Sequence, residues 1–149
     1  MTVQEIALSF VEAINTRNVS RLSELMTVGH MFIDSDGSET AGRERMRLGW
    51  MDYFAMVPDY RIEVKDVFTR SDTVVLLGFA EGTFSQNGVL KGENHWRVTA
   101  AWRAIVSGQG VAMWQVYVNP EPMRNILERI GAPQLPHAAG ARGSGDSQA

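Results

Sequence analysis

Residues 58–67 read Pro-Asp-Tyr-Arg-Ile-Glu-Val-Lys-Asp-Val, and the hydrophobic period of the chain changes inside this stretch. Before Pro58, apolar residues recur at intervals of three and four positions, which predicts helices. From Tyr60 to Val67, apolar and polar residues alternate, which predicts a half-exposed strand. Proline also disfavours the helical conformation in the residue before it, so a helix should end here. Helices followed by strands indicate the α+β class.

Three helices are expected before Pro58. Thr2 and Glu5 have the spacing of a capping box, so the first helix should begin there and end near Asn15. Asn18 is a suitable N-terminal cap for a short second helix. The other elements expected in this half are a short strand at residues 30–34, a turn at 35–37 and a third helix at 42–57.

Three longer strands and a closing helix are expected after the strand at residues 60–67. They lie at about residues 73–84, 94–106, 111–119 and 121–130, with Gly-containing turns between the strands. Beyond Gly131 the chain offers almost nothing to bury, so residues 131–149 are predicted to be a disordered tail. The domain is therefore expected to span residues 1–130, with a curved antiparallel sheet wrapped over about three N-terminal helices like a cone.

Composition narrows the classes of function. The 149 residues include 14 basic and 17 acidic side chains, with a net charge of -3 and no cysteine. Nucleic-acid binders usually carry clustered basic residues, so no nucleic-acid partner is expected. Without thiolates, chemistry depends on carboxylate, imidazole, phenol or guanidinium groups. The sequence has no signal-peptide pattern and no apolar run near the ~20 residues of a membrane span, so a cytoplasmic protein without a membrane partner is expected.

Five short phrases together resemble a known group of proteins. They are Phe32-Ile33-Asp34-Ser35-Asp36-Gly37, Gly42-Arg43-Glu44, Pro58-Asp59-Tyr60-Arg61-Ile62-Glu63-Val64, Gly82-Thr83 and Trp114-Gln115-Val116-Tyr117. In this order they resemble the nuclear-transport-factor-2-like superfamily and, within it, the bacterial SnoaL-like and ketosteroid-isomerase-like proteins. The resemblance implies a curved sheet over helices, a deep apolar pocket for a small molecule, and a homodimer. The superfamily includes isomerases, dehydratases, polyketide cyclases, epoxide hydrolases and transport adaptors, so the fold alone selects no activity.

Asp34 is the first candidate for a catalytic residue. In a strand, His30, Phe32 and Asp34 share one face, which places the carboxylate beside an aromatic ring and an imidazole. The resemblance implies a general-base aspartate at the end of this strand. Burial in an apolar pocket would raise the pKa of such a carboxyl group and suit it to proton removal beside a carbonyl. The alternative is that Asp34 only accepts backbone hydrogen bonds in the turn before Gly37.

His95 is the second catalytic candidate. It shares a predicted strand face with Arg97 and Thr99, where it is a pocket donor, a proton relay or a polar residue on the outer face of the sheet. The resemblance to limonene-epoxide-hydrolase-like members fails at Thr99, because those members carry an aspartate two residues from the arginine. The histidines match neither an H-x-H nor an H-E-x-x-H spacing, so neither a metal nor another cofactor is expected.

Asn119 marks a second departure from the resemblance. Many SnoaL-like sequences carry an aspartate near the end of the last strand, where it acts as acid or base in the cyclase-like members. An amide cannot exchange a proton at neutral pH, but it can orient a carbonyl or hydroxyl group. Asn119 is therefore interpreted either as a ligand-orienting residue or as a cap for the helix that follows Pro120.

The remaining candidates for substrate contact are mostly aromatic. Trp50 and Phe54 share one face of a predicted helix, and aromatic residues at this spacing more often belong to the core than to a ligand site. Tyr53 and Tyr117 can donate a hydrogen bond to an enolate oxygen. The sequence favours a cofactor-free enzyme that moves a proton on an apolar carbonyl compound, by isomerisation, cyclisation or dehydration. The alternative is a non-catalytic ligand-binding or dimerisation module of the same fold. The predicted substrate contacts are His30, Phe32, Trp50, Tyr53, Phe54, Arg97, Trp114, Tyr117 and Asn119.

Overall fold

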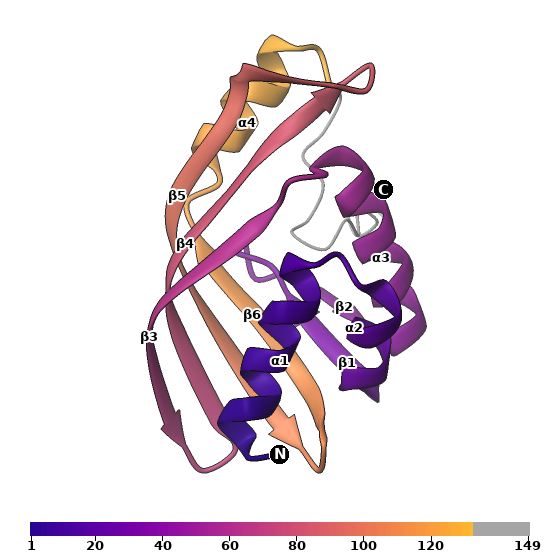
Figure 1. Cartoon of the computed structure of the whole chain (residues 1–149), viewed down its shortest axis with the longest axis vertical. Coiled ribbons are helices and arrows are strands. Elements are labelled where there is room, and N and C mark those ends of the chain that lie inside the picture. Colours follow the sequence, from indigo (N-terminus) through magenta and orange to yellow (C-terminus); the bar gives the residue numbers. More distant parts are fainter. Residues whose placement is uncertain (133–149) are drawn as a thin grey trace.

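The first three helices precede the four long strands in the chain, as predicted, and they cover one face of a curved sheet (Figure 1). A computed structural model describes residues 1–132. Most of the predicted disordered tail, residues 133–149, lies outside the described residues. In chain order the elements are α1 (Val3–Asn15), α2 (Val19–Leu25), β1 (Met26–Ile33), β2 (Glu39–Ala41), α3 (Arg43–Met56), β3 (Arg61–Arg70), β4 (Thr73–Gln86), β5 (Val89–Ser107), β6 (Gly110–Val118) and α4 (Glu121–Arg129).

The six strands form one open sheet with the order β2-β1-β6-β5-β4-β3. Four neighbouring pairs are antiparallel, but β1 and β6 run parallel, so the sheet is mixed where a purely antiparallel one was expected. A parallel pair needs a long crossover connection. In the sequence, all elements from β2 to β5 come between β1 and β6. Because the two strands are so far apart in the chain, no local pattern predicted their pairing.

The predicted helix caps are confirmed. The Thr2 backbone N–H donates to Glu5 Oε1 at 2.8 Å, and the Glu5 N–H donates to Thr2 Oγ1 at 3.1 Å, which completes the capping box of α1. Asn18 Oδ1 accepts from the Arg21 N–H at 3.0 Å at the start of α2. These local hydrogen bonds satisfy backbone donors that have no partner inside the helices.

The strands are longer than periodicity predicted, and one was missed. β5 begins at Val89, five residues before its expected start, because residues 89–93 are exposed on both faces and so show no alternation. Val89 and Leu90 pair with the end of β4, beyond a register shift between Thr83 and Ser85. β2 has only three residues, which is too short for a periodic signal.

The core lies between the inner face of the sheet and the helices α1–α3. Along β5, Trp96, Trp102 and Ala104 are buried, whereas the intervening side chains of His95 and Arg97 are exposed. Residues that face α1–α3 therefore line the inner face, and their neighbours in sequence lie on the outer face.

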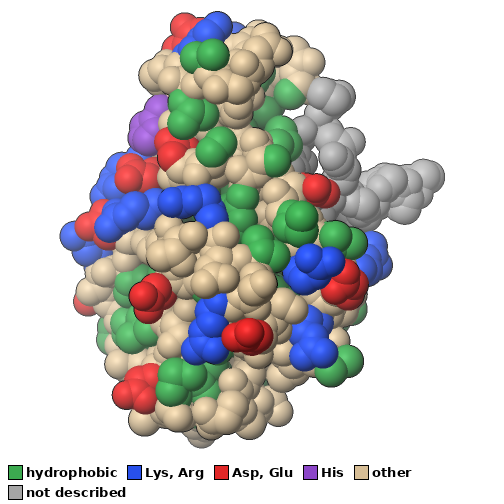
Figure 2. All heavy atoms as spheres, turned by 45° about the vertical axis from the view of Figure 1, so that its right-hand side comes forward, with side chains coloured by type: hydrophobic (Ala, Val, Ile, Leu, Met, Phe, Trp, Pro, Cys, Tyr) green, Lys and Arg blue, Asp and Glu red, His purple; other side chains and the backbone are tan. Residues whose placement is uncertain are grey.

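The surface shows no single dominant charge on the face drawn in Figure 2, where basic, acidic and hydrophobic side chains are interspersed. This mixture agrees with the small net charge of -3. Within residues 1–132, no helix has both the length and the apolar character that crossing a membrane requires.

Candidate functional site

Asp34 follows the last residue of β1 and begins the turn to β2. Its backbone N–H donates to the Ser38 carbonyl at 2.9 Å, and its own carbonyl accepts from the Gly37 N–H at 2.9 Å. Its Oδ1 also accepts from the Ser35 N–H at 2.7 Å. On the same strand face, His30 and Phe32 are completely or almost completely buried. Strand alternation thus directs this end of β1 toward the interior.

Two buried phenols lie within the electrostatic reach of Asp34. Tyr53 is on α3, and Tyr60 is in the connection between α3 and β3. Their rings meet edge to face with centroids 5.0 Å apart. Burial raises the pKa of Tyr53 well above its usual value, and its electrostatic interactions with Tyr60, Asp34 and Asp59 raise it further. Burial and the Asp34 charge likewise raise the pKa of Tyr60, so both phenols keep their protons as hydrogen-bond donors.

Tyr60 lies in the middle of a group of contacting rings. Its centroid is 6.5 Å from that of Trp50 and 6.0 Å from that of Trp96. The rings come from α3, from the α3–β3 connection and from the inner face of β4 and β5, so they join the helical layer to the sheet. We call them the aromatic cluster; its members are Trp50, Tyr53, Phe54, Tyr60, Phe84 and Trp96.

Asp59 fixes the α3–β3 connection to the edge of β4. The pairing of β3 with β4 ends at Arg61 and Glu81, which leaves the next part of the β4 edge without a strand on that side. Asp59 takes that place: Oδ1 accepts from the Thr83 N–H at 2.7 Å, and Oδ2 accepts from Thr83 Oγ1 at 2.7 Å. This clamp holds the residue next to Tyr60 and so positions the centre of the aromatic cluster.

Gly82 allows the same connection to lie close to β4. A Cβ at this position would be 2.3 Å from Val57 Cγ1 and 3.3 Å from Trp96 Cζ2. Any side chain would push away either the connection or the Trp96 ring. The glycine of the Gly82-Thr83 phrase therefore has a steric role in forming the site.

His30 is buried deep in the interior and is neutral. Its Nδ1 lies 2.7 Å from the Val111 carbonyl oxygen, so Nδ1 carries the proton and Nε2 keeps its lone pair. Burial lowers the pKa of His30, and the Val111 hydrogen bond offsets only part of that effect. Nε2 has no hydrogen-bond partner. The ring packs against Phe10 of α1, which also contacts Trp114.

His95 and Arg97 are not brought to Asp34. Both lie on the outer face of β5, with 44% and 41% of their side chains exposed. Arg97 binds Glu63 at 2.8 Å and Glu81 at 3.2 Å, and its guanidinium lies 4.3 Å from the centre of the Phe79 ring. The adjacent Trp96 points inward, so the alternation of the strand carries its two neighbours away from the aromatic cluster.

The hydrogen bonds of His95 agree with a structural position. Thr83 donates its one hydroxyl proton to the Asp59 carboxylate, so His95 Nδ1, 2.9 Å from Thr83 Oγ1, is a donor. His95 Nε2 lies 3.7 Å from Glu81 Oε1. The imidazole thus extends the Asp59 clamp over the outer face.

Tyr117 and Asn119 also lie outside the aromatic cluster. Tyr117 is on the outer face of β6 with 48% of its surface exposed. Asn119 is exposed, and its Oδ1 accepts from the Glu121 N–H at 3.0 Å at the start of α4. Pro120, and not Asn119, is the N-cap residue of α4, so Asn119 holds the first residue of the helix from one position before the cap.

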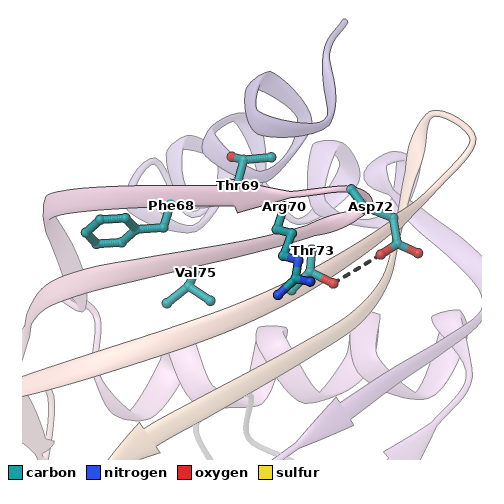
Figure 3. Close-up of a pocket in the computed structure, with 7 residues that line it drawn as sticks. Phe68, Thr69, Arg70, Asp72, Thr73 and Val75 are labelled. Atoms are coloured by element: carbon teal, nitrogen blue, oxygen red, sulfur yellow. Dashed lines mark hydrogen bonds between the residues drawn. The ribbon is translucent and has the colours of Figure 1, made fainter.

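A separate hollow of about 420 Å³ lies at the hairpin between β3 and β4 (Figure 3). Thr73 Oγ1 donates to Asp72 Oδ1 at 3.1 Å in its wall. None of the predicted site residues lines this hollow. Its lining residues are Phe68, Thr69, Arg70, Ser71, Asp72, Thr73 and Val75.

The structure adds members to the site that the sequence had not singled out. Tyr60, Phe84 and Trp96 complete the aromatic cluster, and Asp59 and Thr83 position it. Pro58-Asp59-Tyr60 and Gly82-Thr83 were already part of the resemblance, which was the signal available for these residues. Trp96 follows from alternation once the inner face of β5 is known.

Comparison with known proteins agrees with this architecture. A profile of the SnoaL-like domain matches residues 7–118. A proposed SnoaL-like polyketide cyclase from Shewanella denitrificans superposes with a TM-score of 0.73 at 14% identity, covering 85% of this chain and 97% of its own. A protein with a ketosteroid-isomerase-like fold from Catenulispora acidiphila, solved with trimethylamine, gives 0.69 at 20% identity, covering 89% and 96%. An epoxide hydrolase of the LEH-like type from M. tuberculosis gives 0.71 at 11% identity, covering 85% and 90%.

The chain belongs to the SnoaL-like family, since the family profile spans most of its length. The solved structures share its fold, a curved open sheet over helices, at identities too low to carry a reaction from one protein to another. A search among curated proteins found no match. The comparisons therefore establish the family and the fold of this chain.

Proposed function

We propose that the protein is a cofactor-free enzyme that transfers a proton on an apolar carbonyl compound, with Asp34 as the base. The observation that carries this proposal is the position of Asp34 at the end of the strand face that carries the buried Phe32, where its charge also acts on the buried phenols Tyr53 and Tyr60. A carboxylate with two protonated phenols within its electrostatic reach is a combination suited to enolate formation: one group takes the proton and the others stabilise the developing oxyanion.

The proposed step begins with transfer of a proton from the carbon next to the carbonyl to the Asp34 carboxylate. The electron pair of the broken C–H bond forms the enolate, and the negative charge on oxygen accepts hydrogen bonds from Tyr53 and Tyr60. Return of the proton to another carbon is an isomerisation. Attack of the enolate carbon on a second carbonyl of the same molecule is a cyclisation, and loss of a β-hydroxyl group is a dehydration.

The proposal assigns the oxyanion to the two tyrosines and not to His95. Both phenols are buried in the aromatic cluster, where hydrogen bonds to a developing charge are stronger than in water. The His95 side chain is 44% exposed on the outer face. Tyr117, the other predicted phenol, is on that face too.

Cyclisation stands beside isomerisation and dehydration in this proposal, because the relative that is a proposed polyketide cyclase shares only the fold at 14% identity. Epoxide hydrolysis is disfavoured by this chain's own residues. Thr99 replaces the aspartate that the hydrolase pattern requires, and Arg97 is bound to Glu63 and Glu81 on the outer face.

Deuterium exchange tests the proposal without knowledge of the natural substrate. The probe is α-tetralone, a bicyclic ketone with exchangeable hydrogens on one carbon beside its carbonyl. In D₂O the protein should accelerate exchange at that carbon above the rate in buffer, as followed by proton NMR. Binding of α-tetralone without any acceleration would contradict the reaction.

One observation favours a second candidate, a ligand-binding module without turnover. Asp34 Oδ1 accepts from the Ser35 N–H at 2.7 Å, which is the structural role that the turn predicts for this carboxylate. Such a module would bind α-tetralone and leave its exchange rate at the background value.

We also propose that two copies associate through the outer face of the sheet. Leu77 and Tyr117 are exposed large hydrophobic residues on that face. Arg103 is on the same face of β5, two residues from Ala101, which pairs with both Leu77 and Tyr117. Its Nε is buried and has no hydrogen-bond partner. Asp66, which pairs with Leu77, is exposed on this face. A twofold axis would let Arg103 of one copy meet Asp66 of the other. Sedimentation equilibrium should give a dimer mass that Arg103→Glu shifts toward the monomer; a monomer at all micromolar concentrations would contradict this interface.

A further inference from the structure

Two indole N–H groups in the aromatic cluster are buried without a hydrogen-bond partner. Trp50 is 1% exposed and Trp96 is 4% exposed, and neither Nε1 has an acceptor. A buried donor without an acceptor costs roughly 1–3 kcal/mol, and native proteins contain few of them. Two such donors against the same Tyr60 ring call for a specific explanation.

We propose that Trp50 and Trp96 donate hydrogen bonds to oxygen atoms of the ligand, so the ligand carries neutral oxygen acceptors in addition to the reacting carbonyl. This inference rests on the proposed function, because it names the substrate class of the same site. An indole N–H can only donate, so its partner must be an acceptor. A hydrocarbon would leave both donors unpaired and should therefore bind less tightly.

The acceptors are neutral. Asp34 already brings a negative charge near Tyr53 and Tyr60, and a second carboxylate among these rings would be repelled and poorly solvated. The six members of the aromatic cluster are uncharged, and Arg17, which reaches Tyr60, donates to its backbone carbonyl at 3.1 Å. Ketone, ester or ether oxygens meet these conditions.

The two donors come from opposite layers of the fold and are held in place. Trp50 is on α3, and Trp96 is on the inner face of β5. The edge of the Trp96 ring lies over Gly82, and Trp50 packs edge to face on Tyr53 at 6.2 Å. A ligand that binds both donors therefore bridges the helical layer and the sheet beside the tyrosines.

The test uses two sets of probes that differ only in the replacement of one oxygen atom by a CH₂ group. The first set is α-tetralone with an acetyl group at C5, C6 or C7. The second set has an isopropenyl group of the same shape at the same positions. In ¹⁵N spectra of the full-length protein, at least one acetyl probe should move the indole signals of Trp50 and Trp96 downfield. The isopropenyl counterpart should not, and the signals of Trp102 and Trp114 should stay in place.

The same acetyl probe should bind roughly 5- to 10-fold more tightly than its counterpart, as expected for hydrogen bonds of about 1 kcal/mol. Trp50→Phe and Trp96→Phe should remove this preference, and Trp102→Phe, at a buried tryptophan outside the aromatic cluster, should keep it. If a phenylalanine variant does not fold, the wild-type comparison still decides the question.

Equal affinity for the two sets, or no binding of either, would overturn the inference. So would indole signals that already show contact with bound water and do not respond to the acetyl probes. These results are distinct from failure of the proposed function. An acetyl preference without deuterium exchange contradicts the reaction alone, and exchange without an acetyl preference contradicts this inference alone.

Discussion

The rings of Tyr53 and Tyr60 meet edge to face, with centroids 5.0 Å apart and planes at 86°. Tyr53 belongs to α3, which ends at Met56, and Tyr60 follows in the connection that Asp59 fixes to β4. The pair therefore depends on packing between the helical layer and the sheet. Because burial and the nearby Asp34 charge both raise their pKa values, the two hydroxyls remain donors at neutral pH.

Removing either hydroxyl should slow the proposed reaction and leave the fold intact. Tyr53→Phe and Tyr60→Phe keep the ring contacts but lose one donor to the oxyanion. Loss of one such donor typically lowers a rate by about 100-fold or more. Exchange of α-tetralone should fall by this order, whereas Tyr117→Phe, on the outer face, should retain the wild-type rate. Equal rates in all three variants would remove the tyrosines from the mechanism.

His30 should make stability depend on pH in the weakly acidic range. Its pKa in the folded protein is lowered from the ordinary 6.5, mainly by burial. As the pH falls below 6.5, the unfolded chain takes up a proton at this position more readily than the folded chain, so the free energy of unfolding decreases. The effect is absent above that pH. Urea unfolding between about pH 7 and pH 5 should show this decrease.

The matched variants are His30→Asn and His95→Asn. Asparagine at position 30 keeps a donor for the Val111 carbonyl and cannot be protonated, so the decrease should become smaller. His95 is exposed, and its replacement should leave the decrease as in the wild type. A full decrease in His30→Asn would show that another group is responsible.

The Asp59 clamp should contribute to both stability and activity. Asp59→Ala removes two hydrogen bonds to Thr83 and leaves the buried β4 edge unpaired. We expect a loss of about 1–3 kcal/mol in the free energy of unfolding, measured in urea. Exchange of α-tetralone should also slow, because Tyr60 is no longer held. Asp52→Ala, at an exposed position of α3, is the control and should change neither quantity.

Arg97 should have no part in the reaction. Its contacts are with Glu63 and Glu81 on the outer face, and together with Lys65, whose hydrogen bond is the larger influence, it lowers the pKa of Glu63 to about 2. Arg97→Gln should leave α-tetralone affinity and exchange unchanged. A rate that falls more than tenfold in this folded variant would place the ligand on the outer face.

Patterns of local origin predicted the fold well. Alternation after Pro58 identified the strands, and the Thr2/Glu5 spacing identified the first helix. The parallel pairing of β1 with β6 was not predicted, because no local pattern encodes contact between segments so far apart. The exposed first residues of β5 were missed because neither of their faces is buried.

Less of the site than of the fold was predicted from the sequence, because local patterns do not show which residues meet in the folded protein. Periodicity showed that His95 and Arg97 share a face of the strand, but it could not show which face packs against the helices. The burial of Trp96 settles that question for the whole strand. Asp34, Trp50 and Tyr53 were named from the sequence, whereas Tyr60 was assigned only to the beginning of a strand. Its contacts with Trp50 and Trp96 depend on tertiary packing.

The role of Asp34 as the base is the central claim, and deuterium exchange into α-tetralone by Asp34→Asn tests it most directly. Asparagine preserves the size of the side chain and an oxygen that can accept from the Ser35 N–H, but it cannot take up the proton. Asp36→Asn, in the same turn, is the matched control, since its side chain also accepts a backbone N–H, that of Ser38. We predict that exchange by Asp34→Asn falls by about 100-fold or more, with an unchanged melting temperature, while Asp36→Asn retains the wild-type rate. Wild-type exchange in a folded Asp34→Asn variant would contradict the account.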